Sequence, residues 1–131
     1  MTRLSLILCL MLTLPAWAQD TLSAAEFDAF TKGKTLFYGT LGAPYGAEVY
    51  HDNRRVQWSF LDGECIEGEW YEDSGNICFV YENMPDPQCW TFTKGANGLI
   101  ARFENNPQST TLYDAQDAGE ELLCLGPKVG V

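Results

Sequence analysis

The sequence predicts an all-β fold, a small antiparallel meander barrel of about eight strands with one short N-terminal helix. Apolar and polar residues alternate along 54–60 and 65–71, which is typical of half-buried strands. Turn residues recur about every ten positions, as in consecutive antiparallel strands. Helical signals are confined to one segment near the N-terminus. A two-sheet β-sandwich fits the same pattern and remains the alternative.

Residues 1–18 have the features of a secretory signal peptide. Arg3 gives a positive start, residues 4–14 form an apolar run, and Ala16-Trp17-Ala18 is an A-x-A cleavage sequence. A membrane-spanning helix needs roughly 20 apolar residues, and this run is shorter. We therefore expect cleavage after Ala18, no membrane anchor afterwards, and a periplasmic or secreted mature chain. Residues 19–131 are expected to form a single domain.

The charge of the chain limits its partners. It has 8 Lys and Arg residues against 18 Asp and Glu residues. Loss of the leader removes Arg3, so 7 basic and 18 acidic residues give the mature chain a formal charge of −11. Such a surface repels phosphate backbones, which proteins contact through Lys and Arg. We expect no nucleic-acid partner, whereas basic proteins and cationic ligands stay compatible with the charge, and we expect a soluble monomer.

The single helix is expected at residues 24–32. Ser23 and Glu26 form the S-x-x-E pattern of a capping box. Phe27 and Phe30 lie three positions apart on one helical face, and Gly33 is suited to end the helix. The phenylalanine pair is expected to plug one end of the core.

The period then changes to two, and short strands follow to the end of the chain. Between them, residues 42–46 are expected to form a turn, Asp62-Gly63 a hairpin turn, and residues 82–88 a loop that contains Pro85 and Pro87. Closure of the strands into a barrel would remove exposed sheet edges. The expected strands are 35–39, 48–51, 54–60, 65–71, 77–82, 88–94, 99–104, 110–113 and 122–125.

The four cysteines of the mature chain predict disulfides. Their gaps of 12, 10 and 34 residues contain no C-x-x-C pair of the kind found in structural zinc and redox sites. An even number of cysteines in a small exported domain favours a disulfide framework. We therefore expect no metal and no cofactor. These cysteines are Cys65, Cys78, Cys89 and Cys124.

Four cysteines allow three connectivities. If Tyr81 faces Asp86 in a hairpin, Cys78 faces Cys89 across two antiparallel strands, at a separation that suits a disulfide. Cys65 then remains for Cys124, and this second bridge would tie a middle strand to the last one. We favour this pairing, with the other two still open.

Three short motifs suggest a family. Gly68-x-Trp70, then Ile77-Cys78-Phe79-x-Tyr81, then Cys89-Trp90 resemble the pattern of small exported bacterial domains of unknown function, over roughly residues 35–125. The resemblance implies a lipocalin-like or calycin-like barrel in the periplasm and brings no catalytic residues with it. More distantly, the chain resembles periplasmic inhibitors of proteases and lysozymes built on similar barrels.

Catalytic residue patterns are weak. His51 is the single histidine and lies beside Asp52 in an expected turn, where a solvated side chain is more typical than a general base. Glu67 and Glu69 share one strand face, as paired carboxylates of a glycosidase could, but this pattern is also typical of the solvated face of a sheet. We expect no enzymatic activity.

Aromatic residues are abundant within the expected meander. They fill the core of a narrow barrel, or some of them line an open barrel mouth that binds a small apolar or cationic ligand. Met84 and Pro85 in the 82–88 loop are the candidates for contact with a protein. The candidate cavity residues are Trp58, Trp70, Phe79, Trp90, Tyr38 and Tyr45.

Three functions follow from these patterns. The first is a non-enzymatic binding module for a small ligand or a periplasmic envelope protein. The alternative is an inhibitor of an exported hydrolase, which would need a protruding, rigid 82–88 loop. The third is an enzyme that uses the acidic strand face, and the sequence favours it least.

Overall fold

The computed structural model describes residues 20–40, 42–106, 108 and 112–124. The predicted signal peptide and its cleavage site lie outside the described residues. The elements in chain order are α1 (Ala24–Thr31), β1 (Thr35–Thr40), β2 (Ala43–Tyr50), the 3-10 turn η1 (Asp52–Arg54), β3 (Arg55–Ser59), β4 (Ile66–Asp73), β5 (Asn76–Tyr81), β6 (Met84–Lys94), β7 (Leu99–Phe103) and β8 (Leu112–Gln116).

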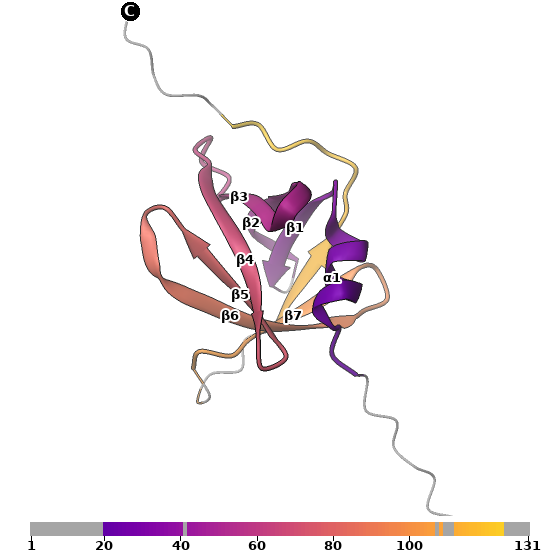
Figure 1. Ribbon diagram of the computed structural model, residues 1–131. Helices are drawn as coiled ribbons and strands as arrows, with labels where there is room; N and C mark the ends of the chain where they lie inside the picture. The colour runs from indigo at the N-terminus through magenta and orange to yellow at the C-terminus, as the bar shows by residue number, and fades with distance from the viewer. Residues whose placement is uncertain (1–19, 41, 107, 109–111, 125–131) are drawn as a thin grey trace, which may run out of the picture.

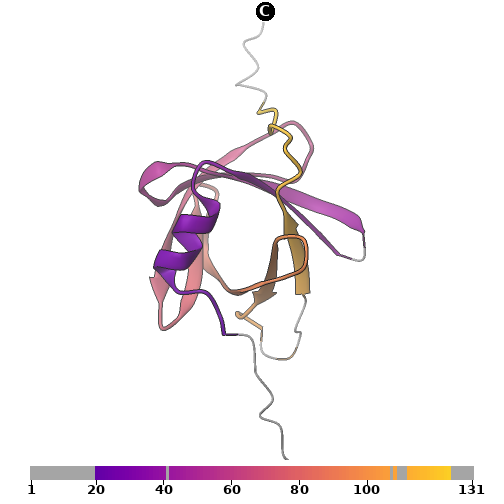
Figure 2. The same ribbon diagram turned by 90° about the vertical axis from the view of Figure 1, so that its right-hand side faces the viewer.

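The eight strands form a closed antiparallel barrel in which each strand pairs with the next one along the chain (Figures 1 and 2). The last strand returns to the first, so that Tyr38 of β1 pairs with Ala115 of β8. This closure confirms the predicted meander barrel with one helix and excludes the sandwich. It also gives both edges of the sheet a partner, which an open sheet of this size lacks.

Helix α1 closes one end of the barrel. Its capping box is formed, because the Ser23 hydroxyl accepts a hydrogen bond from the Glu26 N–H and the Glu26 carboxylate accepts one from the Ser23 N–H, both at 3.1 Å. The helix ends at Thr31, and Gly33 follows with a φ of +76°. Phe27 is fully buried, whereas Phe30 is half-buried at the edge of the core. The plug is therefore Phe27, with Phe30 beside it.

The core at this end consists mostly of aromatic rings packed around Phe27. The Phe27 ring centroid lies 4.5 Å from that of Phe92, 5.1 Å from that of Trp70 and 5.6 Å from that of Tyr50. The contacts with Trp70 and Tyr50 are edge-to-face, a geometry that aromatic quadrupoles favour. Tight packing of this kind fixes the helix against the barrel without a covalent link.

Strand β2 begins earlier than the sequence predicted. Residues 43–46 were expected to form a turn because Pro44 and Gly46 are common in turns, but they lie in the strand. Pro44 is paired with Gly39 next to a register shift, where a missing N–H is tolerated. Gly46 lies against the indole of Trp58, and a Cβ at this position would overlap that ring. The glycine therefore makes room for a neighbouring side chain.

The expected loop 82–88 is also wrong. Glu82 and Asn83 alone form the turn, and β6 begins at Met84. Tyr81 faces Met84 and not Asp86, but a register shift between Phe79 and Tyr81 still brings Cys78 opposite Cys89. The extra residues of β6 include two prolines, which cannot donate to the ladder and are typical of such irregular pairing.

The last expected strand, 122–125, is not formed. Residues 122–124 have no regular secondary structure, and residue 125 lies outside the described residues. The final strand is β8, and Cys124 lies in the segment that follows it. The Cys65–Cys124 disulfide ties this segment to the connection between β3 and β4.

Both favoured disulfides are present, Cys65–Cys124 and Cys78–Cys89. Two such bonds in a small domain suggest an oxidising, extracellular compartment. In the part of the chain that the structure describes, no helix has the length and apolar character to cross a membrane.

Candidate functional site

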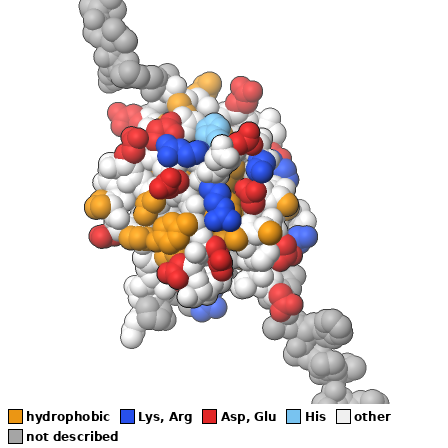
Figure 3. All heavy atoms as spheres, in the orientation of Figure 1, with side chains coloured by type: hydrophobic (Ala, Val, Ile, Leu, Met, Phe, Trp, Pro, Cys, Tyr) orange, Lys and Arg blue, Asp and Glu red, His pale blue; other side chains and the backbone are white. Residues whose placement is uncertain are grey.

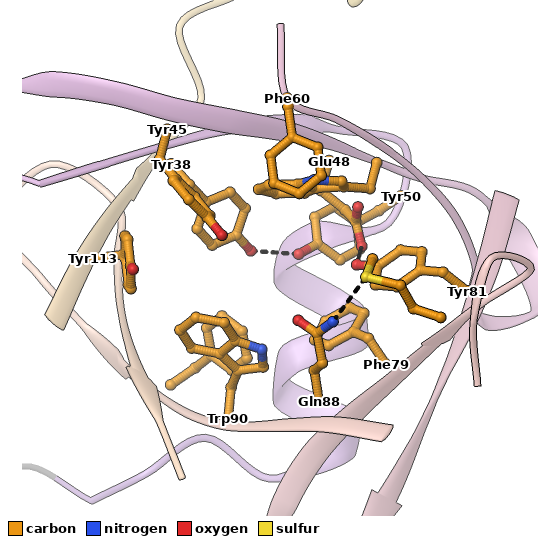
Figure 4. A pocket seen from close by; sticks show the side chains of 13 residues that line it. Tyr38, Tyr45, Glu48, Tyr50, Phe60, Phe79, Tyr81, Gln88, Trp90 and Tyr113 are labelled. Carbon is orange, nitrogen blue, oxygen red and sulfur yellow. Dashed lines mark hydrogen bonds between the residues drawn. The ribbon is translucent and has the colours of Figure 1, made fainter. Parts of the chain in front are cut away.

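The barrel contains an unfilled, aromatic-lined cavity, which we call the cup. Helix α1 lies behind it in Figure 4. The cup has a volume of about 40 Å³, and on this scale about 10–15 Å³ accommodates one water molecule. The cup therefore has space for a small group and not for a whole drug-sized ligand. The cup is lined by Tyr38, Tyr45, Glu48, Tyr50, Trp58, Phe60, Phe79, Tyr81, Met84, Gln88, Trp90, Phe92 and Tyr113.

Strand pairing places these side chains inside the barrel. Directly paired residues on antiparallel strands point to the same face of the sheet. Glu48 of β2 pairs with Leu36 of β1 on one side and with Trp58 of β3 on the other. Because Leu36 and Trp58 both belong to the buried core, the Glu48 side chain must also point inward.

Aromatic rings form the wall and the rim of the cup. The ring of Tyr45 lies 5.6 Å from that of Trp58, 5.8 Å from that of Phe60 and 5.1 Å from that of Tyr113. Trp90 continues the wall, 5.5 Å from Tyr113. Tyr45 and Phe60 are 44% and 46% exposed, although both also line the cup. The rim therefore presents apolar surface to solvent.

The floor of the cup is polar. Tyr38 and Tyr50 are buried and joined by a hydrogen bond between their hydroxyls (Figure 4). Tyr81 donates its hydroxyl hydrogen to Glu48 Oε1 at 2.8 Å. Glu48 is only 1% exposed, and its second oxygen, Oε2, has no hydrogen-bond partner among the described residues. A buried polar atom of this kind is unusual, because it loses its water without a replacement.

Burial sets the ionisation of this floor. It raises the pKa of the Glu48 carboxyl well above its ordinary value of 4.5, while the hydrogen bond from Tyr81 opposes the shift. Burial also raises the pKa of Tyr38, Tyr50 and Tyr81 above the ordinary value of 10. The tyrosines are therefore neutral at physiological pH, and the empty site favours the neutral form of Glu48.

The structure brings five of the six candidate cavity residues together. Trp58, Phe79, Trp90, Tyr38 and Tyr45 all line the cup. Trp70 does not line it, because it packs against Phe27 at the helix end of the barrel, with the Arg54 guanidinium 4.5 Å from its ring centroid.

Met84 and Pro85, the two candidates for protein contact, lie in different environments. Met84 is half-buried and lines the cup, where its sulfur accepts a hydrogen bond from Gln88 Nε2 at 3.4 Å. Pro85 is exposed. Adjacent residues of a strand point to opposite faces, so only one of the two could face outward.

Sequence reasoning missed the polar floor. Glu48 lies in the stretch Ala47-Glu48-Val49-Tyr50, where both faces contain apolar residues. A charged residue beside Ala47 and Val49 suggests an outward direction. The alternation of the strand places Glu48 on the same face as Tyr50. This alternation alone does not show which of the two faces points into the barrel.

The other residues considered for catalysis lie apart from the cup. His51 is exposed, and its Nε2 lies 3.0 Å from Gln57 Oε1. The Glu67 carboxylate accepts a hydrogen bond from Gln57 Nε2, and Glu69 lies 3.6 Å from the Arg55 guanidinium. Within the described residues, no three His, Cys, Asp or Glu side chains gather into a group that could hold a metal ion.

Comparisons with protein-family models, with curated proteins and with solved structures find no match for this chain. The resemblance to small exported bacterial domains therefore stays a prediction.

Proposed function

We propose that this protein is a non-enzymatic binding module, secreted or periplasmic, that holds a small ligand in the cup. The observation that carries the proposal is the unfilled, aromatic-lined space at the mouth of an otherwise packed barrel. Small-molecule sites are typically concave, mostly apolar and supplied with a few polar groups. The cup has this composition, with aromatic walls above a floor of tyrosines and one carboxyl group.

The exposed rim supports the same function. Tyr45 and Phe60 keep large apolar surfaces in contact with solvent, although burial of such rings is favourable by roughly 25 cal/mol for each Å². A ligand that lies across the rim would cover both rings. The acidic side chains spread over the face seen in Figure 3 would help to keep such a protein soluble.

The three tryptophans of residues 19–131 provide the test. Trp58 and Trp90 line the cup, whereas Trp70 packs at the helix end. The ¹⁵N-labelled protein is first refolded from denaturant to remove any co-purified ligand. We would then titrate it with 1-hexanol and follow the indole N–H resonances by NMR. Saturable shifts of Trp58 and Trp90 without a shift of Trp70 are expected. Equal shifts of all three, or none, would contradict binding in the cup.

A second candidate function is inhibition of an exported hydrolase. It is favoured by the hairpin of β5 and β6, which projects from the barrel in Figure 1. The Cys78–Cys89 disulfide joins the two strands of this hairpin. The side chain of Asn105 adds two hydrogen bonds: its Nδ2 donates to the Pro87 carbonyl at 2.8 Å, and its Oδ1 accepts from the Cys89 N–H at 2.7 Å. A rigid, exposed segment loses little entropy on binding, as a tight inhibitor requires.

Enzyme titration separates this candidate from the first. We would titrate a secreted serine protease and a lysozyme with the protein. Stoichiometric inhibition that is lost in Asp86→Arg, on the exposed part of the hairpin, and retained in Glu67→Gln would favour the inhibitor. Full enzyme activity at excess protein would contradict it for those two enzyme classes.

A further inference from the structure

We propose that the ligand of the cup is a small organic cation, a primary ammonium group on an apolar chain, that donates hydrogen bonds to Glu48. This inference rests on the proposed function and adds the chemical class of the ligand. The ammonium group would lie at the floor, against Glu48 Oε2, and the chain would extend through the mouth past Tyr45 and Phe60.

Glu48 lines the cup. Its Oε2 atom is buried and has no hydrogen-bond partner among the described residues. The other oxygen of the carboxyl group is occupied by the Tyr81 hydroxyl. Leaving a buried polar atom unpaired costs on the order of 1–3 kcal/mol, which a ligand donor in the cup would remove. A group with several N–H donors fits this position, because Tyr38, Tyr50 and Tyr81 place further oxygen atoms around it (Figure 4).

The walls favour a positive charge over a negative one. Aromatic faces attract cations through their quadrupoles, and Trp58, Trp90, Tyr45, Phe60 and Tyr113 all contribute rings to the cup. Among the described lining residues there is no Lys, Arg or His. A carboxylate or phosphate ligand would therefore meet a carboxyl group and no balancing cation. The formal charge of −10 on the whole chain acts in the same direction.

Binding would be coupled to loss of a proton. The titratable groups that face Glu48 are Tyr38 of β1, Tyr50 of β2 and Tyr81 of β5, and those nearer the mouth are Tyr45 and Tyr113. Burial raises the pKa of the Glu48 carboxyl and so favours its protonated form before a ligand enters. When R–NH₃⁺ enters, the carboxyl O–H breaks, the proton passes to the buffer, and a carboxylate–ammonium pair remains. An ordinary hydrophobic cup would take up its ligand without this proton release.

The experiment uses three ligands with the same chain and different head groups, hexylammonium, 1-hexanol and hexanoate. Isothermal titration calorimetry at neutral pH gives their affinities for the refolded protein. Repeating the hexylammonium titration in phosphate and in HEPES gives the number of protons released, because the two buffers differ in ionisation enthalpy. The variant is Glu48→Gln, which keeps the shape of the side chain, and the matched control is Glu67→Gln on the outside of the barrel.

The expected result is that hexylammonium binds roughly tenfold or more tightly than 1-hexanol, as hydrogen bonds to a charged group allow. Its binding should release up to one proton, and Glu48→Gln should remove both the preference and the release. Glu67→Gln should leave both unchanged. Retention of 1-hexanol binding by Glu48→Gln would show that this variant is folded.

Three results would overturn the inference, and they differ in what they imply for the cup. Equal affinity for hexylammonium and 1-hexanol, without proton release, would contradict a cationic ligand but leave the cup as a binding site. Preference for hexanoate would contradict it in the same way. Failure of all three ligands, with no shift of the Trp58 and Trp90 resonances, would contradict the proposed function as well.

Discussion

The two ends of the barrel differ in how they are stabilised. At the helix end, Phe27 fills the interior and touches four other aromatic rings, and every polar group of the capping box is paired. At the cup, a space is left unfilled, two rings at the rim are exposed, and one buried oxygen has no hydrogen-bond partner among the described residues. Ligand sites are commonly less stable than the scaffold that carries them. The difference therefore separates a tightly packed end from the end where we propose that a ligand binds.

Both disulfides lie close in sequence to residues of the cup or its rim. Cys89 lies between Gln88 and Trp90, which both line the cup, and Cys65 is the last residue of the β3–β4 connection, which also contains Phe60. Disulfides can stabilise the fold around such a site where packing is incomplete, because they lower the conformational entropy of the unfolded chain.

Removal of the aromatic plug should have the largest effect on stability. Phe27→Ala is expected to lower the free energy of unfolding by about 3–5 kcal/mol, because it leaves a cavity among packed rings. Urea unfolding followed by tryptophan fluorescence measures the change. Phe30→Ala on the same helix, where the side chain is only half-buried, should cost clearly less. Equal losses in the two variants would contradict Phe27 as the plug.

The long-range disulfide should come next. The double variant Cys65→Ala with Cys124→Ala removes a disulfide between residues 59 positions apart. The chain-entropy estimate for the stabilisation lost is about 4 kcal/mol. Cys78→Ala with Cys89→Ala opens a disulfide across 11 residues, worth about 3 kcal/mol. Urea unfolding of both double variants gives the order. We also expect weaker ligand binding in both, and unchanged binding would show that packing alone holds the cup in shape.

The buried carboxyl should make stability depend on pH. Because the pKa of Glu48 in the folded state is raised above 4.5, its protonated form stabilises the fold below about that pH. This contribution is lost as the pH rises through the raised value. Relative to Glu48→Gln, the wild-type protein should therefore become less stable from about pH 5 to about pH 8.

Urea unfolding of the two proteins at both pH values measures this difference, which should be smaller than the effect of Phe27→Ala. Phe27→Ala itself serves as the control, because it weakens the helix end and leaves Glu48 in place. Its stability should fall with pH as in the wild-type protein. A wild-type difference from Glu48→Gln that does not change with pH would mean that folding leaves the pKa of Glu48 unchanged.

The exposed rim should have the smallest effect on stability. Phe60 is 46% exposed, so that Phe60→Ala should lower the free energy of unfolding by at most about 1 kcal/mol. The same change should weaken hexylammonium binding several-fold, because the alkyl chain loses a wall. Calorimetry and urea unfolding on one sample measure both quantities. A large loss of stability with unchanged affinity would place Phe60 in the scaffold and not in the rim.

Much of the fold could be predicted because its signals are local. The alternation of Val56 and Trp58 with polar neighbours identified β3, and the Ser23–Glu26 capping box identified α1. The Cys78–Cys89 pair was also predicted, although the assumed partner of Tyr81 was wrong. The pairing was recovered because the irregularity between Phe79 and Tyr81 shifts the register by two residues, which the assumed hairpin had placed in its loop.

Errors arose where one residue type fits two environments. Pro44 and Gly46 are turn residues in most sequences, but here one lies at a register shift and the other leaves room for Trp58. Trp70 shares the aromatic character of the cup residues and lies at the opposite end. A strand pattern gives the face of a residue but not its level along the barrel, since that level depends on the tilt of the closed sheet.

Local patterns and composition were enough to predict most of the strands, the helix, the acidic character and the preferred disulfide pairing, because these depend on neighbouring residues and on residue counts. Tertiary contacts were needed to show that Glu48 points inward and that its Oε2 has no hydrogen-bond partner among the described residues. They were also needed to show that five of the aromatic candidates line the same cup as Glu48. The reason is physical. The pairing of β2 with β1 and β3 fixes which face of β2 points into the barrel. The closure of β1 on β8 fixes the shape of the cup through contacts between residues far apart in the chain.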